Sequence, residues 1–199
     1  MELTLAEELL LLLVPEEAWT RPARRGTNAA LAAAMLVELV EDGGAEVVDG
    51  EVSVRGAHPL ADLSGGTVED ALSGFGYYRT VLDLLTERGV LTRHWRVFST
   101  EWRLADRERR DALHTEVAAV LTGDAEPTTR TGTLVAMLYA LATVRQLFPG
   151  PGVRKRAGEV ARATWPASEL IGAVTAAANA GPEWTPGGGG ASPDTPSGD

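Results

Sequence analysis

Residues 29–41 read AALAAAMLVELVE, and they carry the clearest structural signal in the chain. Leu31, Met35 and Leu39 recur every four residues, and apolar side chains fill most positions between them. A helix that is apolar almost all round has no face to present to solvent, so it must lie in the core with other elements packed around it. Gly43 and Gly44 follow as a stop signal. The stretch therefore predicts a protein built around one buried helix.

Cap signals place other helices on both sides of this core helix. Thr4 and Glu7 have the spacing of a capping box ahead of the leucine run Leu9–Leu13. Thr27 or Asn28 is available to cap the core helix itself. Together, caps and apolar periodicity predict further helices near residues 67–73, 76–88, 107–122, 130–147, 153–164 and 167–179.

Two segments are predicted to form β-hairpins. In residues 46–54, Asp49 and Gly50 suit a tight turn between two short β-branched runs. Residues 92–104 read TRHWRVFSTEWRL, and their β-branched and aromatic side chains favour two strands over a helix. Residues 181–199 are rich in Pro, Gly and Ser and are predicted to be disordered. The fold class is mainly α, a helical bundle core with small β-hairpins, in a single domain over residues 1–180.

The charge of the chain is distributed unevenly. The 199 residues carry a formal net charge of −10. Residues 1–90 have 16 acids and 6 bases, whereas residues 91–165 have 8 acids and 12 bases, a local balance of +4. This asymmetry indicates that a face built by the middle segment meets an anionic partner, although a solvated basic helix would have the same composition. The use of 17 arginines and one lysine is typical of a GC-rich bacterial genome.

No pattern in the sequence points to catalysis. His58, His94 and His114 lie far apart, cysteine is absent, and no nucleotide-binding, hydrolase or metalloprotease motif is found. The acidic pairs 7–8 and 41–42 are interpreted as helix caps and solvated faces. The early apolar run follows glutamates and is too short to span a membrane. We therefore expect a cytoplasmic protein that is not an enzyme and has no cofactor or metal.

Four motifs occur in an order known from one protein family. They are Leu3–Leu12 (LTLAEELLLL), Ala34–Leu39 (AMLVEL), Glu87–Leu91 (ERGVL) and Leu134–Phe148. In this order and spacing they resemble the opening helix, the core helix, the turn before a hairpin and a later helix of the Golgi phosphoprotein 3 family. Its members are peripheral membrane proteins that bind phosphatidylinositol 4-phosphate, and eukaryotic members also hold the cytosolic tails of Golgi glycosyltransferases. The resemblance covers residue 3 to about residue 180.

The resemblance implies two lipid-binding elements. One is the hairpin after Gly89, which would insert into membranes and self-associate. The other is a headgroup pocket built from a tryptophan and several arginines. This sequence departs from the family at that pocket, because the arginine positions fall on Ala32, Phe75 and Tyr78 and the tryptophan position falls near Ala23. Residues near the pocket that could replace those of the family are Trp19, Arg24, Arg25 and Arg79.

Arg24 and Arg25 precede the start of the core helix, where free backbone N–H groups favour an anion. The alternative is a loop pair that is solvated or bridged to Glu16 and Glu17.

Three interpretations of residues 92–104 remain open. In the first, the hairpin is a membrane element whose aromatic side chains enter the headgroup region while its arginines meet lipid phosphates. In the second, it is the wing of a winged-helix DNA-binding regulator, although the preceding helix brings no net positive charge, so nucleic acid is unlikely. In the third, it is a structural hairpin of a helical protein-interaction module. The residues of the membrane interpretation are Arg93, Trp95, Arg96, Val97, Phe98, Trp102 and Arg103.

Taken together, these observations favour a peripheral membrane protein that binds anionic lipid, with phosphatidylinositol 4-phosphate as the candidate headgroup. A homo-oligomer formed through the hairpin is the expected protein assembly.

Overall fold

The fold is mainly helical, as the sequence predicts. The computed structural model describes residues 2–15, 17, 25–55, 66–72, 77–96 and 99–180, without the side chains of Arg25, Gly66, Glu69, Arg96 and Ser99. Within these residues there are nine helices and two small antiparallel sheets. The predicted tail, residues 181–199, lies outside the described part of the chain.

The helices and strands have the following bounds along the chain. The helices are α1 (Leu5–Leu13), α2 (Arg25–Glu41), α3 (Val68–Leu72), α4 (Tyr77–Glu87), α5 (Arg107–Thr122), α6 (Thr129–Ala140), α7 (Val144–Leu147), α8 (Val153–Ala163) and α9 (Ala167–Asn179). The strands are β1 (Ala45–Val48), β2 (Glu51–Val54), β3 (Gly66–Thr67), β4 (Leu91–Arg96) and β5 (Ser99–Leu104).

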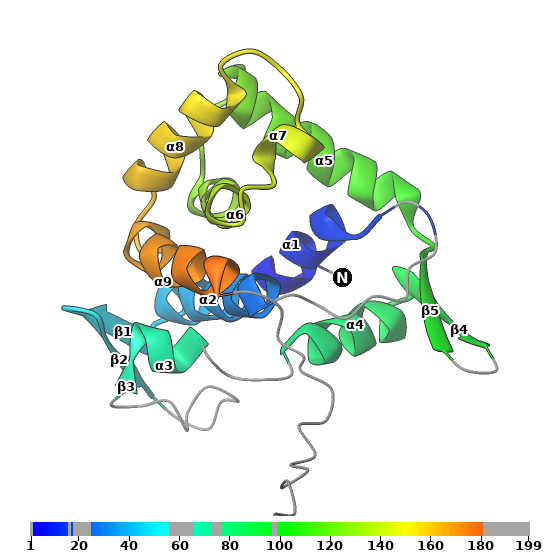
Figure 1. Cartoon of the computed structure of the whole chain (residues 1–199), viewed down its shortest axis with the longest axis horizontal. Coiled ribbons are helices and arrows are strands. Elements are labelled where there is room, and N and C mark those ends of the chain that lie inside the picture. The colour runs from blue at the N-terminus through cyan, green and yellow to red at the C-terminus, as the bar shows by residue number, and fades with distance from the viewer. Residues whose placement is uncertain are drawn as a thin grey trace, which may run out of the picture.

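Two helices form the centre of the molecule. Helix α2 packs against α1, α4, α6 and α9, and its residues 29–34 are all buried, which confirms the predicted core helix. Helix α6 is seen end-on in Figure 1, enclosed by α1, α2, α5, α8 and α9. Residues 131–138 of α6 are buried without interruption. None of the described helices combines the length and the apolar character needed to cross a membrane.

The first sheet joins three strands in the order β1-β2-β3. Asp49 and Gly50 have φ of 52° and 79°, the left-handed conformation that a tight hairpin turn requires, so the predicted turn is confirmed. Strand β3 was not predicted, because two residues carry no periodic signal. It leads directly into α3, whose predicted cap is confirmed by the reciprocal bonds between Thr67 and Asp70.

The structure corrects two predicted boundaries. Helix α2 begins at Arg25, so Thr27 and Asn28 lie inside the helix and do not cap it. The Asn28 side-chain oxygen instead accepts a hydrogen bond from the backbone N–H of Tyr78 at 3.0 Å, which ties the first turn of α2 to the first turn of α4. The single helix predicted over residues 130–147 is divided into α6 and α7.

The division between α6 and α7 is made by a residue in the left-handed conformation. Ala142 has φ of 57°. Its N–H donates to Tyr139 O at 3.0 Å and the N–H of Thr143 donates to Leu138 O at 3.1 Å, the Schellman pattern that ends a helix. Glycine normally occupies this position, and alanine is strained there because its Cβ approaches the backbone carbonyl.

We expect Ala142→Gly to raise the free energy of unfolding by about 1 kcal/mol, because glycine adopts a positive φ without strain. Urea denaturation monitored by circular dichroism measures the change. Ala125→Gly, at an exposed position outside the helices, is the matched control and should not stabilise the protein. A loss of stability in Ala142→Gly would show that the side chain contributes packing that outweighs the strain.

Candidate functional site

The second sheet is the hairpin β4–β5, which stands at the edge of the molecule beyond α4 (Figure 1). Gly89 ends α4 with φ of 72°, and the N–H of Val90 donates to Leu85 O at 2.9 Å. The chain is thereby turned out of the helix and into β4. The N–H of Ala105 donates to Val90 O at 2.9 Å and closes the base of the hairpin. The two predicted strands are confirmed over 91–96 and 99–104. Val97 and Phe98 lie outside the described residues.

One face of the hairpin carries its tryptophans. Arg93 is paired with Trp102, and Trp95 is paired with Thr100. Because directly paired residues share a face and alternate residues along a strand do too, Arg93, Trp95 and Trp102 lie on the same side. Trp102 is partly buried against the core, whereas Trp95 is 75% exposed. The two tryptophans that the sequence grouped together therefore differ: Trp102 anchors the base and Trp95 is open to solvent.

Arg93 lies between a carboxylate and the exposed tryptophan. Its Nη1 atom is 3.4 Å from Oδ1 of Asp83 in α4. Its guanidinium carbon is 5.4 Å from the centre of the Trp95 ring, within the range of a cation–π contact. This arrangement holds the indole and a positive charge side by side at the surface.

The opposite face of the hairpin is polar. Arg103 is paired with Thr92 in the register, and its Nη2 atom is 3.5 Å from Oε2 of Glu101. Arg103 therefore does not share a face with the tryptophans, although the sequence prediction put all these residues at one surface. Arg96 is the last residue of β4, and its side chain is not described.

The headgroup candidates are only partly described. Trp19 and Arg24 lie outside the described residues, and Arg25 is the first residue of α2 with no described side chain. Arg79 is exposed in the first turn of α4. Because the bond between Asn28 and Tyr78 joins the first turns of α2 and α4, the N-terminal ends of these two helices lie side by side.

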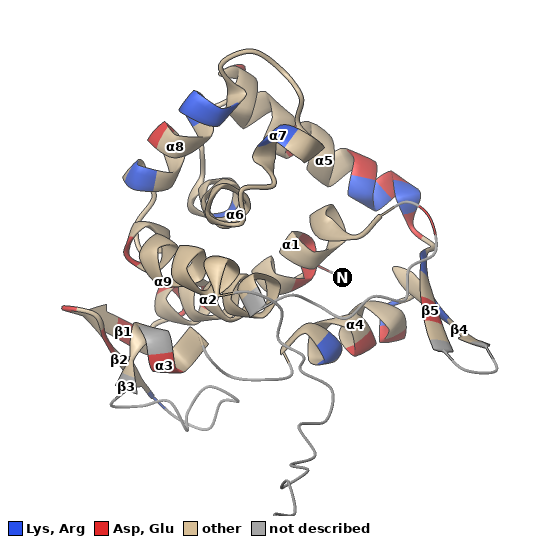
Figure 2. Cartoon of the chain, in the orientation of Figure 1, with Lys and Arg blue, Asp and Glu red and all other residues tan. Residues whose placement is uncertain are grey.

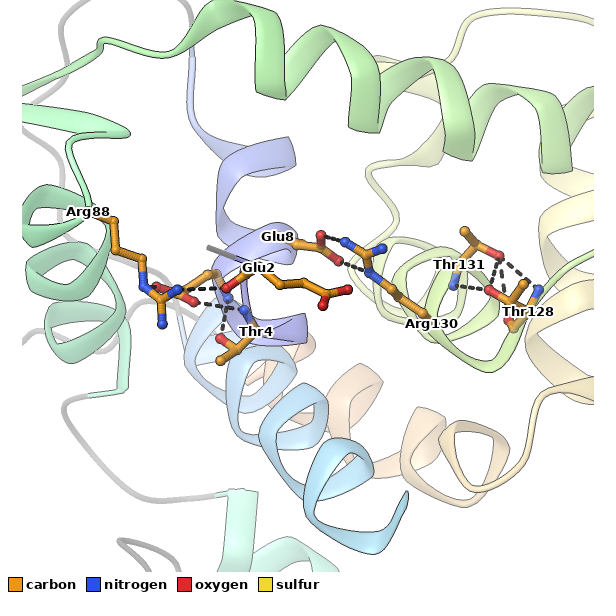
Figure 3. A network of polar contacts seen from close by, with 8 residues as sticks. Glu2, Thr4, Glu8, Arg88, Thr128, Arg130 and Thr131 are labelled. Atoms are coloured by element: carbon orange, nitrogen blue, oxygen red, sulfur yellow. Dashed lines mark hydrogen bonds and ion pairs between the residues drawn. The ribbon is translucent and has the colours of Figure 1, made fainter. Parts of the chain in front are cut away.

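Sequence reasoning missed a buried ionic network at the start of the chain (Figure 3). The predicted capping box is confirmed, because Thr4 N donates to Glu7 at 2.8 Å and Thr4 accepts from Glu7 N at 3.3 Å. Glu7 is fully buried and contacts Arg88 Nε at 2.8 Å as an ion pair. Arg88 also donates to the carbonyl of Glu2 at 2.7 Å. The network ties α1 to the end of α4.

Glu8 forms the second half of the network. Its side chain is 4% exposed, and Arg130 at the start of α6 donates to both of its carboxylate oxygens, with Nε to Oε2 at 2.7 Å. The prediction that the pair 7–8 is a cap or a solvated face is thus wrong for Glu8 and incomplete for Glu7. The sequence offered no signal for these partners, because Arg88 and Arg130 are distant along the chain.

Acidic residues also gather beside the N-terminus. A cavity of about 330 Å³ is lined by Glu2, Glu38, Glu41, Asp42 and Arg130. Burial raises the pKa of Glu38 above its usual value of 4.5. The negative charges of Asp42 and Glu7 act in the same direction, and a hydrogen bond from the Leu5 backbone opposes them.

Glu38→Gln should increase stability at pH 7. The folded state disfavours the charged form of the wild-type carboxylate, and glutamine has no charge to bury. The gain should disappear as the pH falls through the raised pKa of the folded state toward 4.5 and below, because wild-type Glu38 then becomes neutral in both states.

Urea midpoints at pH 7 and pH 4 test this prediction. The exposed Glu126→Gln is the control and should show no such pH dependence. A variant less stable than wild type at pH 7 would mean that the bond to Leu5 outweighs the burial of the charge.

Within the described residues, no group of three or more His, Cys, Asp or Glu side chains is placed to hold a metal ion. Comparison with known proteins gives one result. The sequence model of a family described as Golgi phosphoprotein 3 (GPP34) matches residues 5–177, which is most of the chain. No curated protein matches the sequence.

Proposed function

The chain belongs to the Golgi phosphoprotein 3 family, and from this premise we propose that it is a peripheral membrane protein that binds anionic lipid through the face of β4–β5 that carries Trp95. The observation that carries the proposal is the pairing of Trp95, 75% exposed, with the guanidinium of Arg93. Tryptophan combines a large apolar surface with one hydrogen-bond donor, which suits the boundary between lipid tails and headgroups.

The position of α4 supports a shared membrane-facing side. Arg79 and Asp83 are four residues apart in this helix and so lie on the same face. Asp83 contacts Arg93 of the hairpin, so the face of α4 that carries Arg79 continues into the hairpin. The opposite face of α4 is buried through Val81, Leu82 and Leu85. This arrangement supports a membrane-facing side that includes both Arg79 and the hairpin.

The hairpin itself supplies local positive charge, since residues 91–104 hold three arginines and one glutamate, a balance of +2. The start of α5, separated from β5 by two residues, adds none, because residues 106–111 hold three arginines and three acids, and blue and red lie side by side there in Figure 2. Each basic residue near an anionic membrane adds about 1 kcal/mol of attraction. This local charge is needed, because the chain as a whole is at −10 and an anionic membrane would otherwise repel it.

We propose phosphatidylinositol 4-phosphate as the candidate headgroup, with Arg24, Arg25 and Arg79 as the residues that bind it. The adjoining N-terminal ends of α2 and α4 support this assignment, because helix N-termini favour phosphate. On this proposal the protein is cytoplasmic, associates with membranes peripherally, self-associates through the hairpin and catalyses no reaction.

Vesicle flotation tests the proposal. The protein should float with vesicles containing phosphatidylserine or phosphatidylinositol 4-phosphate and stay behind with neutral phosphatidylcholine vesicles. Binding should weaken as salt rises, because part of the attraction is electrostatic. Preference for phosphatidylinositol 4-phosphate over phosphatidylserine at equal membrane charge would support the headgroup assignment. Absence of flotation with every anionic vesicle would refute lipid binding and favour a protein-interaction module.

A further inference from the structure

A polar cavity lies on the part of the bundle formed by the end of α6 together with α7, α8 and α9. Its volume is about 340 Å³. The strained Ala142 at the break between α6 and α7 forms part of its wall. The polar side chains that line this α7–α8 cavity are Tyr139, Arg145, Arg154, Thr175 and Asn179. It shares no residue with the hairpin or with the headgroup candidates.

The cavity has two cations and no anion. None of its lining residues is acidic. Within the described part of the chain, neither Arg145 nor Arg154 forms an ion pair with a carboxylate. Their neighbour Arg156 does, since its guanidinium lies 3.9 Å from Glu159. Two arginines that line one cavity without a counter-charge give it a positive potential, which favours an anion.

The wall of the cavity is held firmly. A Cβ atom at Gly158 of α8 would lie 3.2 Å from the ring of Tyr139, so this ring rests directly on the backbone of α8. Arg154 is the second residue of α8, and the cap residue of this helix is Gly152, which has no side chain that could bind the free backbone N–H groups. The positive end of the helix dipole therefore adds to the charge of Arg154.

We propose that the α7–α8 cavity binds a small ligand that carries a phosphomonoester. Guanidinium groups bind phosphate through paired N–H donors, and here two of them line the same cavity as Tyr139, Thr175 and Asn179, whose side chains can also donate. So many donors exceed what one carboxylate accepts and match the three terminal oxygens of a phosphomonoester. The volume leaves room for a small organic group beside the phosphate.

Calorimetric titration of the full chain tests the proposal. The probes are inorganic phosphate and glycerol 3-phosphate, in chloride buffer at constant ionic strength. Both should bind saturably at one site and compete with each other, and acetate should not displace them. The proposal is wrong if neither probe binds saturably, or if acetate binds as tightly as phosphate.

Substitutions locate the binding. Arg145→Ala and Arg154→Ala should each weaken phosphate binding by roughly tenfold, as expected for loss of a charged hydrogen-bond donor, and the double variant should show no saturable binding. Arg162→Ala is the matched control, because Arg162 is exposed on α8 and does not line the cavity. All three arginines are exposed, so the variants should keep the wild-type circular dichroism spectrum and thermal midpoint in chloride. Wild-type affinity in the double variant, or an equal loss in Arg162→Ala, would overturn the assignment.

Flotation then identifies the source of the phosphate. If a lipid supplies it, the double variant should lose binding to vesicles containing phosphatidic acid but retain binding to phosphatidylserine vesicles. If a soluble compound supplies it, flotation should be unchanged while glycerol 3-phosphate binding is lost. The hairpin variant Trp95→Ala should bind glycerol 3-phosphate normally, so failure of the hairpin proposal and failure of this one give different results.

Discussion

Replacing Arg130 by methionine should lower the free energy of unfolding by about 3–5 kcal/mol, because it leaves a buried carboxylate without its cation. Glu8 is 4% exposed, and Arg130 donates to both of its oxygens. Methionine keeps much of the apolar stem of arginine but none of its donors. Domains of this size have a total stability of about 5–15 kcal/mol, so the loss would be a large fraction of it.

Urea denaturation at pH 7 measures this effect. The double variant Glu8→Leu with Arg130→Met should recover most of the loss, because a buried ion pair and an apolar pair of similar size are often close in stability. Arg55→Met is the matched control. Arg55 contacts Glu46 at 3.3 Å with side chains 73% and 58% exposed, and losing such a pair should cost less than about 1 kcal/mol.

A loss below about 1 kcal/mol in Arg130→Met would contradict the expectation for a buried pair. It would mean that water reaches Glu8 through the cavity of about 260 Å³ that Glu8 and Arg130 line together with Arg109 and Glu116.

The parts of the fold that the sequence predicted well are those with local signals. Helix α5 runs over the predicted residues 107–122, and Asp106 caps it through the N–H of Arg109 at 3.0 Å. The hairpin β4–β5 follows from β-branched and aromatic residues placed after a glycine that ends a helix. In each case the residues that set the structure are neighbours along the chain, so the pattern alone contains the information.

The features that the sequence did not predict depend on contacts between distant residues. Glu8 and Arg130 are 122 positions apart, and nothing near Glu8 indicates that α6 will bring an arginine to it. The break at Ala142 has neither the glycine nor the proline that usually marks one, so the local sequence does not indicate it. Asn28 has the chemistry of a cap but is used to bind α4.

The amino-acid composition located the candidate membrane site, but the pairing register of β4 and β5 was needed to show which of its residues share a face. The sequence groups Trp95, Trp102 and Arg103 as equivalent members of one basic and aromatic stretch. Because side chains alternate along a strand, Arg103 lies on the opposite face from the two tryptophans. The tryptophans differ in burial, since Trp102 packs against the core and Trp95 is exposed. Among the described residues of the hairpin, Trp95 and Arg93 are therefore the candidates for contact with a membrane.

Trp95→Ala should weaken binding to anionic vesicles by about thirtyfold. A tryptophan buries about 150–250 Å² when fully covered, and half of that area at about 25 cal/mol per Å² corresponds to roughly 2 kcal/mol. The fold should be unchanged, because the side chain is 75% exposed and contributes little to the core. Flotation at increasing lipid concentration gives the affinity, and circular dichroism checks the fold.

Two further variants separate insertion from general effects of charge and hydrophobicity. Trp165→Ala is the matched control, since Trp165 is 59% exposed but lies between α8 and α9, away from the hairpin, and its loss should leave lipid binding unchanged. Asp83→Asn should strengthen binding and increase its sensitivity to salt, because it removes the carboxylate that now offsets Arg93. Equal losses in Trp95→Ala and Trp165→Ala would mean that tryptophans bind vesicles wherever they are exposed. Weaker binding in Asp83→Asn would mean that the ion pair with Asp83 positions Arg93 against Trp95. The position of Arg93 would then matter more to the membrane contact than the positive charge that Asp83 neutralises.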